Sequence, residues 1–284
     1  MHSDTWNKIW VTQCLTGSLA WLVIALPVQA AFDERYKLSI GTVLTRFNSH
    51  ITINSQDGSI DKEIDFEDDA GFDSDVRTSW ISGWYRVGDN HRLKLSYMPI
   101  RRTAFRQIDK DIIVDNTTIK AGAVMASDAN NDIFDISYIY SVYKKPNLEV
   151  GLSAGLYWLS TDSTILAAGE IQAEGDDTPV FKSDFESKQK LQAPLPLFGI
   201  SADYAITPSW RTRAAFRYLH VTIDNIEGDL FTVDIGTEYY FNRHWGLGAS
   251  LGYVDLNVDT DGVLLTNSLG WSYDGILIYG VFKY

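Results

Sequence analysis

Trp245-Gly246-Leu247-Gly248-Ala249-Ser250-Leu251-Gly252-Tyr253 is the stretch that decides the fold. Apolar and aromatic residues fill its odd positions, while glycine and serine fill most of its even positions. Successive side chains of a β-strand point to opposite faces, so this strand has one apolar face and one nearly bare face. Trp245 and Tyr253 bracket the apolar face, as the aromatic girdles of membrane-spanning strands do. The stretch therefore predicts a strand of an all-β, transmembrane, antiparallel up-and-down barrel.

The same alternation recurs along the chain, in segments that suit the ~9–11 residues of a tilted spanning strand. These segments are 36–44, 134–142, 148–158, 198–206 and 233–241. Short turns are expected at 88–91, 144–147, 207–209 and 242–244, and longer polar loops at 48–76, 104–131, 160–192, 223–230 and 258–264. Short turns on one side and long loops on the other are typical of outer-membrane barrels. The count closes at ten strands, with eight and twelve left open; 112–114 with 119–124, and 165–171, are candidates for extra hairpins or strand extensions.

Two registers follow from these strands. A hairpin turn centred on Asp261-Gly262 pairs residues whose numbers sum to 523, which brings the odd-numbered apolar face of 245–253 beside the even-numbered apolar positions of 276–284. The prolines test the assignment, because a proline removes a ladder donor. We expect Pro99, Pro194 and Pro196 to lie at or beyond the outer interface, or at bulges.

The first thirty residues differ from the rest. Lys8 precedes a mostly apolar run from Ile9 to Leu26, and Val28 and Ala30 are the small residues that signal peptidase requires. Residues 1–30 are therefore predicted to be a signal peptide cleaved between Ala30 and Ala31, which leaves residues 31–284 as the barrel.

Composition excludes several function classes. The net charge of −13 argues against nucleic-acid binding. The only cysteine, Cys14, lies in the leader, so no disulfide or cysteine-ligated metal is expected after it. We expect no cofactor, because no zinc spacing, phosphate loop or nucleophile elbow occurs. No apolar run after residue 31 is long enough for a transmembrane helix.

The last residues carry a family resemblance. Phe282 and Tyr284 place aromatic residues at the third-last and last positions, although Tyr279 stands where the family pattern prefers glycine. This ending resembles the terminal strand of outer-membrane proteins that the barrel-assembly machinery recognises. Together with the leader and the alternation, the chain resembles the small barrels of the OmpA and OmpW type. The resemblance implies a location in the outer membrane, with lipid and lipopolysaccharide as surroundings, and does not transfer an activity. A monomer is expected.

Charged residues fall on the predicted lumen face. A register summing to 451 would pair Arg217 with Asp234 and Arg213 with Glu238. The sequence predicts a salt-bridged network that fills a narrow interior, with a selectivity constriction as the alternative. Its expected members are Lys37, Glu149, Asp203, Arg211, Arg213, Arg217, Asp234 and Glu238, and Lys94 also suits the lumen.

Acidic residues crowd the first long loop, between Asp57 and Asp75. Such oxygen ligands could hold a divalent cation, while the simpler interpretation is a solvated loop. His220, with Thr222 and Asp224 on its face, is expected near the outer rim, and with Asp68-Asp69 it fits an omptin protease site only loosely. A lipid A deacylase pattern is not matched. The predicted function is a closed or narrow barrel with a structural or surface-contact role and no enzymatic activity; a channel for small, even hydrophobic, solutes and a barrel hydrolase are the alternatives.

Overall fold

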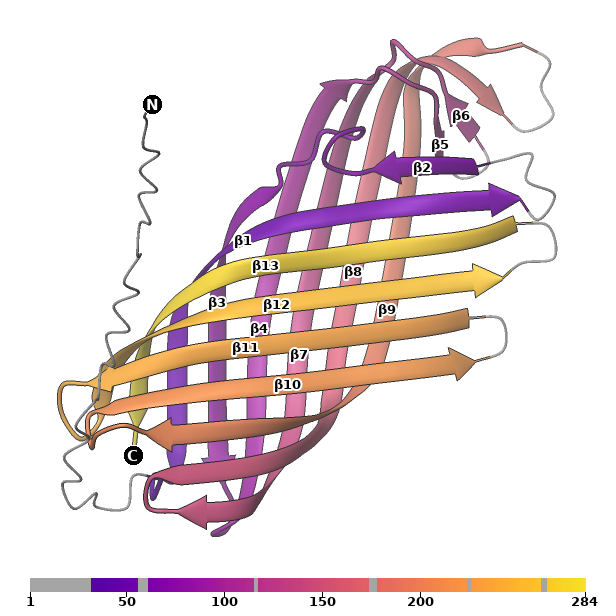
Figure 1. Ribbon diagram of the computed structural model, residues 1–284. Coiled ribbons are helices and arrows are strands. Elements are labelled where there is room, and N and C mark those ends of the chain that lie inside the picture. The colour runs from indigo at the N-terminus through magenta and orange to yellow at the C-terminus, as the bar shows by residue number, and fades with distance from the viewer. Residues whose placement is uncertain (1–31, 56–60, 115–116, 174–177, 224–225, 262–264) are drawn as a thin grey trace, which may run out of the picture.

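The computed structural model describes residues 32–55, 61–114, 117–173, 178–223, 226–261 and 265–284. Every regular element in these residues is a β-strand (Figure 1). The ten long strands are β1 (Tyr36–Ser55), β3 (Asp75–Arg86), β4 (His91–Gln107), β7 (Val124–Lys145), β8 (Leu148–Ala173), β9 (Val180–Ala205), β10 (Trp210–Ile223), β11 (Ile226–Tyr240), β12 (Trp245–Asp261) and β13 (Leu265–Lys283). The short strands are β2 (Asp61–Asp65), β5 (Ile112–Val114) and β6 (Thr117–Ile119). The predicted leader and its Ala30/Ala31 cleavage site lie outside the described residues.

The ten long strands close into one antiparallel barrel, which confirms the predicted architecture and strand count. From β8, hydrogen-bonded neighbours follow in the order β7, β4, β3, β1, β13, β12, β11, β10 and β9, and β9 pairs back with β8. The first and last strands meet, since the Tyr36 amide donates to the Tyr284 carbonyl at 3.0 Å. In the described part of the chain, no helix is long and apolar enough to cross a membrane.

A belt of exposed apolar side chains surrounds the barrel. Ile40, Leu247 and Leu251 are 56%, 60% and 61% exposed, which hydrocarbon tolerates and water does not. Aromatic rings gather at the end with the short turns, where the Trp245 and Phe282 ring centroids lie 4.8 Å apart. Tyr284, the other residue of the predicted terminal signal, stacks on Tyr36 and His244 in the same girdle. At the other end of the belt, the rings of Tyr97 and Phe134 stack at 4.6 Å.

The outer ends of the strands extend far beyond this belt. β8 and β9 have 26 residues each, more than twice what a span needs. Most of 160–192 is therefore strand and not the predicted loop, because polar residues above the membrane keep pairing across the ladder. The proposed extension at 165–171 is confirmed as part of β8, and 112–114 forms a hairpin with 117–119. β6 adds this hairpin to the edge of β8.

Both predicted registers are wrong by an even number of residues. Trp245 pairs with Phe282, so β12 and β13 pair at a sum of 527 rather than 523. The connection is longer than two residues, because Asp261 still pairs with Thr266. Arg211 pairs with Glu238, so β10 and β11 pair at 449 rather than 451. An even error leaves every side chain on its predicted face, which is why the facing of the strands was still correct.

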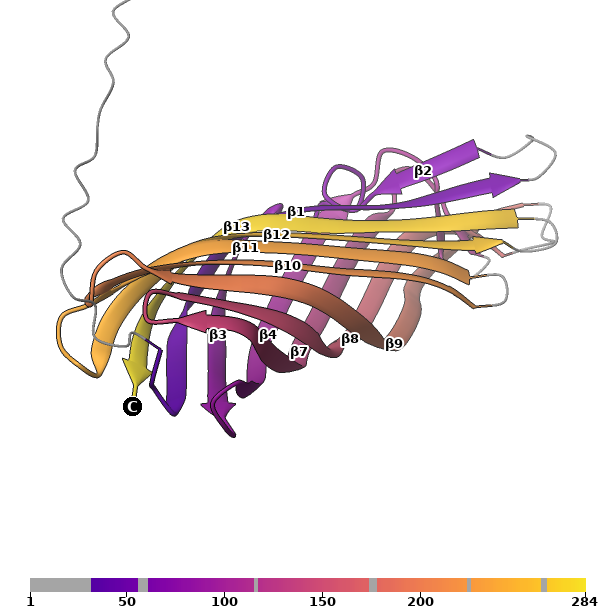
Figure 2. The ribbon, with the colours of Figure 1, turned by 60° about the horizontal axis from the view of Figure 1, so that its bottom comes forward.

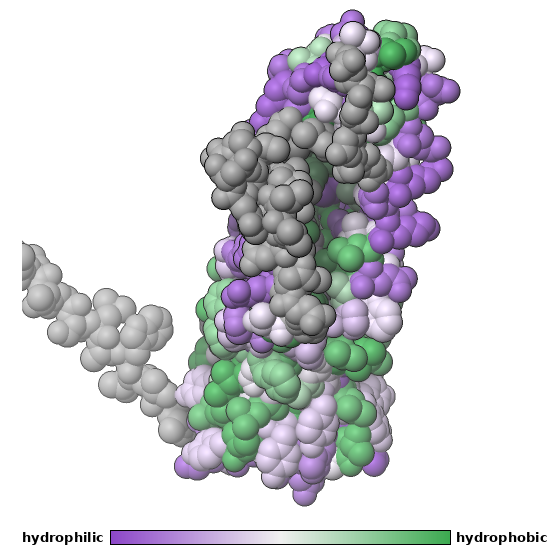
Figure 3. Space-filling view, turned by 90° about the vertical axis from the view of Figure 1, so that its right-hand side faces the viewer, coloured by the Kyte–Doolittle hydropathy of each residue, from purple (hydrophilic) through white to green (hydrophobic). Residues whose placement is uncertain are grey.

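The barrel wall divides at two seams on its outer side, and prolines lie at both. Pairing of β3 with β4 reaches no further than Ile81 and Tyr97, two residues before Pro99. Pairing of β9 with β10 ends at Phe198 and Tyr218, two residues from Pro196, with Pro194 beyond it. Above the seams, β4, β7, β8 and β9 form one wall, while β10 to β13 with β1 and β3 form the other (Figures 1 and 2). Viewed from the outer strand ends, the molecule has a recess between its walls (Figure 3).

Candidate functional site: the barrel lumen

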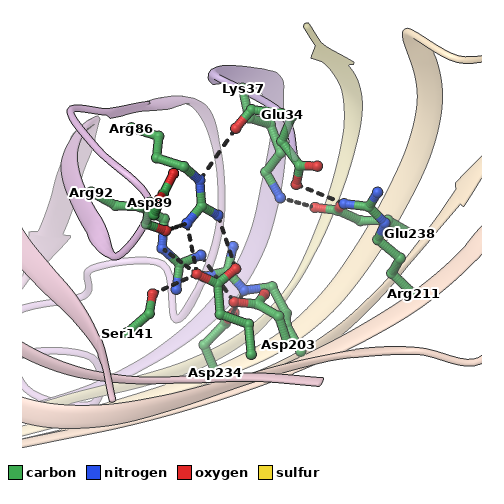
Figure 4. A network of polar contacts seen from close by, with 12 residues as sticks. Glu34, Lys37, Arg86, Asp89, Arg92, Ser141, Asp203, Arg211, Asp234 and Glu238 are labelled. Atoms are coloured by element: carbon green, nitrogen blue, oxygen red, sulfur yellow. Dashed lines mark hydrogen bonds and ion pairs between the residues drawn. The ribbon is translucent and has the colours of Figure 1, made fainter. Parts of the chain in front are cut away.

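The lumen near the short turns is filled by buried ion pairs, several of which Figure 4 shows. Arg86 on β3 binds Glu149 on β8 with two hydrogen bonds, 2.8 and 2.9 Å long. The Ser141 hydroxyl donates to the same carboxylate, which is completely buried. Arg92 on β4 donates to Asp203 on β9 at 3.1 Å. These contacts tie β3 to β8 and β4 to β9, which are not hydrogen-bonded neighbours in the barrel wall.

A second group of ion pairs lies around Glu238 on β11. Lys37 on β1 donates to this carboxylate at 2.6 Å, and the Tyr240 and Tyr279 hydroxyls donate at 2.6 and 3.0 Å. Arg211, the register partner of Glu238, donates instead to Glu34 at 2.7 Å. The buried carboxylate thus accepts three hydrogen bonds, which compensates for its loss of water.

A third group lies deeper in the barrel and is less tightly paired. Arg217 on β10 binds Asp135 on β7. Lys94 Nζ is 3.8 Å from the same carboxylate, and Arg213 Nε is 3.8 Å from Asp234. The Arg213 Nε has no hydrogen-bond partner among the described residues. Neither Lys94 nor Arg213 donates a hydrogen bond to a carboxylate among the described residues, whereas each buried cation nearer the turns that is described above does so.

Above the ion pairs, the lumen is apolar. Ile100, Leu197 and Leu230 are 0–1% exposed and come from β4, β9 and β11. The packed cluster combines both walls, with Val43, Phe47, Met98, Ile100, Ile133, Tyr157, Leu159, Leu197, Leu219, Leu230, Val254 and Leu256 as its buried members. This core lies on inward-facing positions. The barrel interior therefore has two layers, with ion pairs toward the short turns and apolar side chains toward the long loops.

All eight predicted lumen residues lie on inward-facing positions, but their predicted pairing was wrong. Glu238 binds Lys37, not Arg213, and Arg217 binds Asp135, not Asp234. The pairs join strands across the lumen, so the register of neighbouring strands did not determine them. Asp135, Glu34, Arg86 and Arg92 were missed. Arg86 and Arg92 flank the turn at 88–91 and lie on even-numbered positions, which face inward on both strands. The alternation of the two strands could therefore have identified them.

Outside the membrane, the loop acids bind basic residues. Arg102 binds Glu67, which also accepts from the Ser49 amide at 2.8 Å, and Lys110 Nζ lies 2.5 Å from Asp69. Beneath them lies a second apolar cluster formed by Ala70, Ile108, Ile112, Ile119, Ala123, Met125 and Ala167. Among the described acids of 57–75, Asp65, Glu67, Asp69 and Asp75 thus have protein partners at their carboxylates, and the divalent cation stays a prediction.

His220 lies on the outward face of β10, next to exposed Tyr218. Its Nδ1 lies 2.9 Å from an Asp229 carboxylate oxygen on β11. A ring nitrogen of His220 and one carboxylate oxygen each of Asp229 and Glu227 all lie within 4.8 Å of one another. Asp68 and Asp69 contact Arg106 and Lys110 instead. The described acidic neighbours of His220 are thus Asp229 and Glu227. Asp224 lies outside the described residues, and the omptin-like site stays an alternative.

No family model matches the sequence, and no curated protein matches it either. The fold is similar to that of the outer-membrane protease OmpT from Escherichia coli, with a TM-score of 0.56 and 10% identity over 92% of this chain and 100% of that one. The toluene transporter TodX of P. putida gives a TM-score of 0.36 with 9% identity, over 92% and 93% of the chains. The attachment protein Ail of Yersinia pestis gives 0.33 with 8% identity, over 88% and 97%. The closed ten-stranded barrel and its exposed apolar belt are those of a membrane-spanning β-barrel, and OmpT has a similar fold.

Proposed function

We propose that this protein is a closed outer-membrane barrel that carries a rigid platform at the cell surface and does not act as a pore. The observation that carries the proposal is the ion-pair network across the lumen beneath a packed apolar core. An open pore needs a continuous polar path, which the apolar core interrupts. A closed, charge-filled interior is what a barrel of ~8–10 strands is expected to have.

The extended outer strands support a surface role. β7, β8 and β9 continue well beyond the belt, and the second apolar cluster joins them to the first two loops. The buried Arg102–Glu67 pair fixes this junction, because it links β4 to the loop that follows β1. Such a layer is too ordered to be a set of solvated loops, so we propose that it presents a fixed surface to the environment of the cell.

The proposed role is not enzymatic. His220 points away from the lumen, and its partner is an exposed carboxylate. Lipopolysaccharide around the belt and the barrel-assembly machinery at the terminal aromatic residues are proposed as the partners of the barrel itself.

Conductance across a planar bilayer tests the proposal. The full chain, refolded and inserted, is expected to give no current steps above those of the protein-free bilayer. A variant with Arg86, Arg92, Glu149 and Asp203 all changed to serine, together with Phe47→Ser and Leu230→Ser, removes one group of ion pairs and two large side chains of the apolar core, and it is expected to conduct if it remains folded. Steady steps from the unchanged chain would overturn the closed-barrel proposal and favour a narrow channel.

A further inference from the structure

Closure alone does not explain a cavity of about 160 Å³ that lies between the ion pairs and the apolar core. Its wall includes charged residues of the ion pairs and apolar residues of the core. Lys94, Asp135, Arg213, Arg217 and Asp234 contribute three cations and two carboxylates. The wall therefore has one more positive than negative charge, although the whole chain carries −13.

Lys94 and Arg213 both border this cavity. The nearest carboxylate oxygen to Lys94 Nζ is 3.8 Å away, and Asp135 is already bound by Arg217. Arg213 Nε is equally far from Asp234 and makes no hydrogen bond among the described residues. Buried cations nearer the turns each donate a hydrogen bond to a carboxylate, as Lys37 does to Glu238 at 2.6 Å. A cation in a protein interior is costly without a close partner, so Lys94 and Arg213 are suited to receive an anion.

The rest of the wall is aromatic and aliphatic. Trp80, Tyr157, Tyr273 and Leu277 line it, and the Trp80 ring lies 5.6 Å from that of Tyr279, another wall residue. An apolar cavity of about 150 Å³ is known to hold one benzene molecule. The space therefore fits a single ring, and small-molecule sites of this kind combine an apolar wall with a few polar groups that orient the ligand.

We propose that this cavity binds a small monoaromatic carboxylate. The carboxylate lies between Lys94 and Arg213 and accepts hydrogen bonds from both, while the ring packs among Trp80, Tyr273 and Leu277. The ligand fills a space that the closed barrel leaves empty, so binding does not require the barrel to conduct.

Calorimetric titration of the refolded full chain with benzoate tests the proposal. Benzamide, which has the same shape without the charge, and acetate, which lacks the ring, are the comparison probes. Benzoate is expected to bind at least tenfold more tightly than either one. Lys94→Met is expected to weaken benzoate binding at least tenfold, since a charge-assisted hydrogen bond is lost.

A cavity-filling variant tests the location separately. At Gly252, which lines the cavity, an added Cβ would meet no atom nearer than 4.0 Å, so Gly252→Leu adds a side chain without a backbone clash. It is expected to abolish benzoate binding while the barrel still folds. Arg46→Gln, which removes an exposed arginine on β1, is the matched control and should leave binding unchanged.

Three outcomes would overturn the proposal. One is the absence of benzoate binding to the unchanged chain at millimolar concentration. Another is equal affinity for benzoate and benzamide, which would remove the role of the cations. The third is unchanged binding by the folded Gly252→Leu variant, which would place the ligand elsewhere.

Discussion

Arg217 on β10 binds Asp135 on β7, three strands away around the wall, although its backbone pairs with β9 and β11. Arg86 and Glu149 make a similar connection between β3 and β8. The backbone ladders therefore fix each strand against its neighbours, while the ion pairs fix one side of the barrel against the other. In a barrel with two seams in its outer wall, these pairs hold the two sides together below the apolar core.

The first prediction concerns Glu238→Gln. The change removes the negative charge that Lys37 faces at 2.6 Å in a buried position. Tyr240 and Tyr279 donate to different carboxylate oxygens, so only one of the two hydroxyls keeps its acceptor on the amide. Leaving one partner of a buried ion pair unpaired costs about 3–5 kcal/mol, so the free energy of unfolding should fall by about 3 kcal/mol. Urea unfolding of the refolded barrel in lipid measures this change.

Glu227→Gln is the matched control, because Glu227 is exposed on the same strand. Its effect on the free energy of unfolding should stay within about 0.5 kcal/mol. If the two variants unfold at the same urea concentration, the Lys37–Glu238 pair does not stabilise the barrel.

The sequence predicted which side chains face the lumen, but it did not predict which charged side chains bind one another there. The alternation in 245–253 decides inside from outside, and a register error of two or four residues leaves that decision unchanged. Glu238 could be placed in the lumen for this reason. Lys37 could not be identified as its partner, because that contact crosses the lumen and depends on the barrel's diameter and tilt. Strand extension beyond the membrane was also underestimated, since polar strands in water lack the apolar alternation on which the prediction relied.

The second prediction concerns the seam between β9 and β10. Prolines at 194 and 196 lack an N–H donor, yet the pairing of β9 with β8 runs through both positions without a register shift. Their nitrogen atoms must therefore face the open seam. The backbone N–H groups of successive residues point alternately toward the two sides of a strand, so the N–H of Gln192 faces the seam and that of Leu191 faces β8. Gln192→Pro continues the series and should change the free energy of unfolding by less than about 1 kcal/mol. Leu191→Pro removes a donor to β8 and should cost about 3 kcal/mol.

Both of these positions are exposed, so side-chain burial differs little between the two variants. Unfolding in urea and limited proteolysis of the outer strands provide the comparison. Equal loss of stability in both variants would show that β9 has no free edge above Phe198.

The third prediction concerns pH and the first loop. Burial raises the pKa of Asp69, but hydrogen bonds from Lys110 and from the Asp65 amide together lower it by more, so the net pKa lies below its usual value. A carboxyl group with a lowered pKa stabilises the folded loop above the unfolded pKa of about 3.9, and this contribution is lost as the pH falls through the folded pKa. Hydrogen exchange of the amides at 65–70 should therefore lose protection below about pH 4, after correction for intrinsic rates. Asp69→Asn should remove most of this pH dependence, and a persistent dependence would mean that another group controls the loop.

The fourth prediction concerns His220. The side chains of His220 and Asp229 are 46% and 39% exposed, and exposed ion pairs contribute about 0–1 kcal/mol. His220→Ala should therefore change the free energy of unfolding by less than about 1 kcal/mol. Peptide hydrolysis by whole cells and the lipid A profile should both match those of cells with the unchanged chain, because the histidine faces away from the lumen. Loss of either activity in the folded His220→Ala variant, with activity kept in Arg46→Gln, would make the outer face of β10 a catalytic surface and overturn the non-enzymatic proposal.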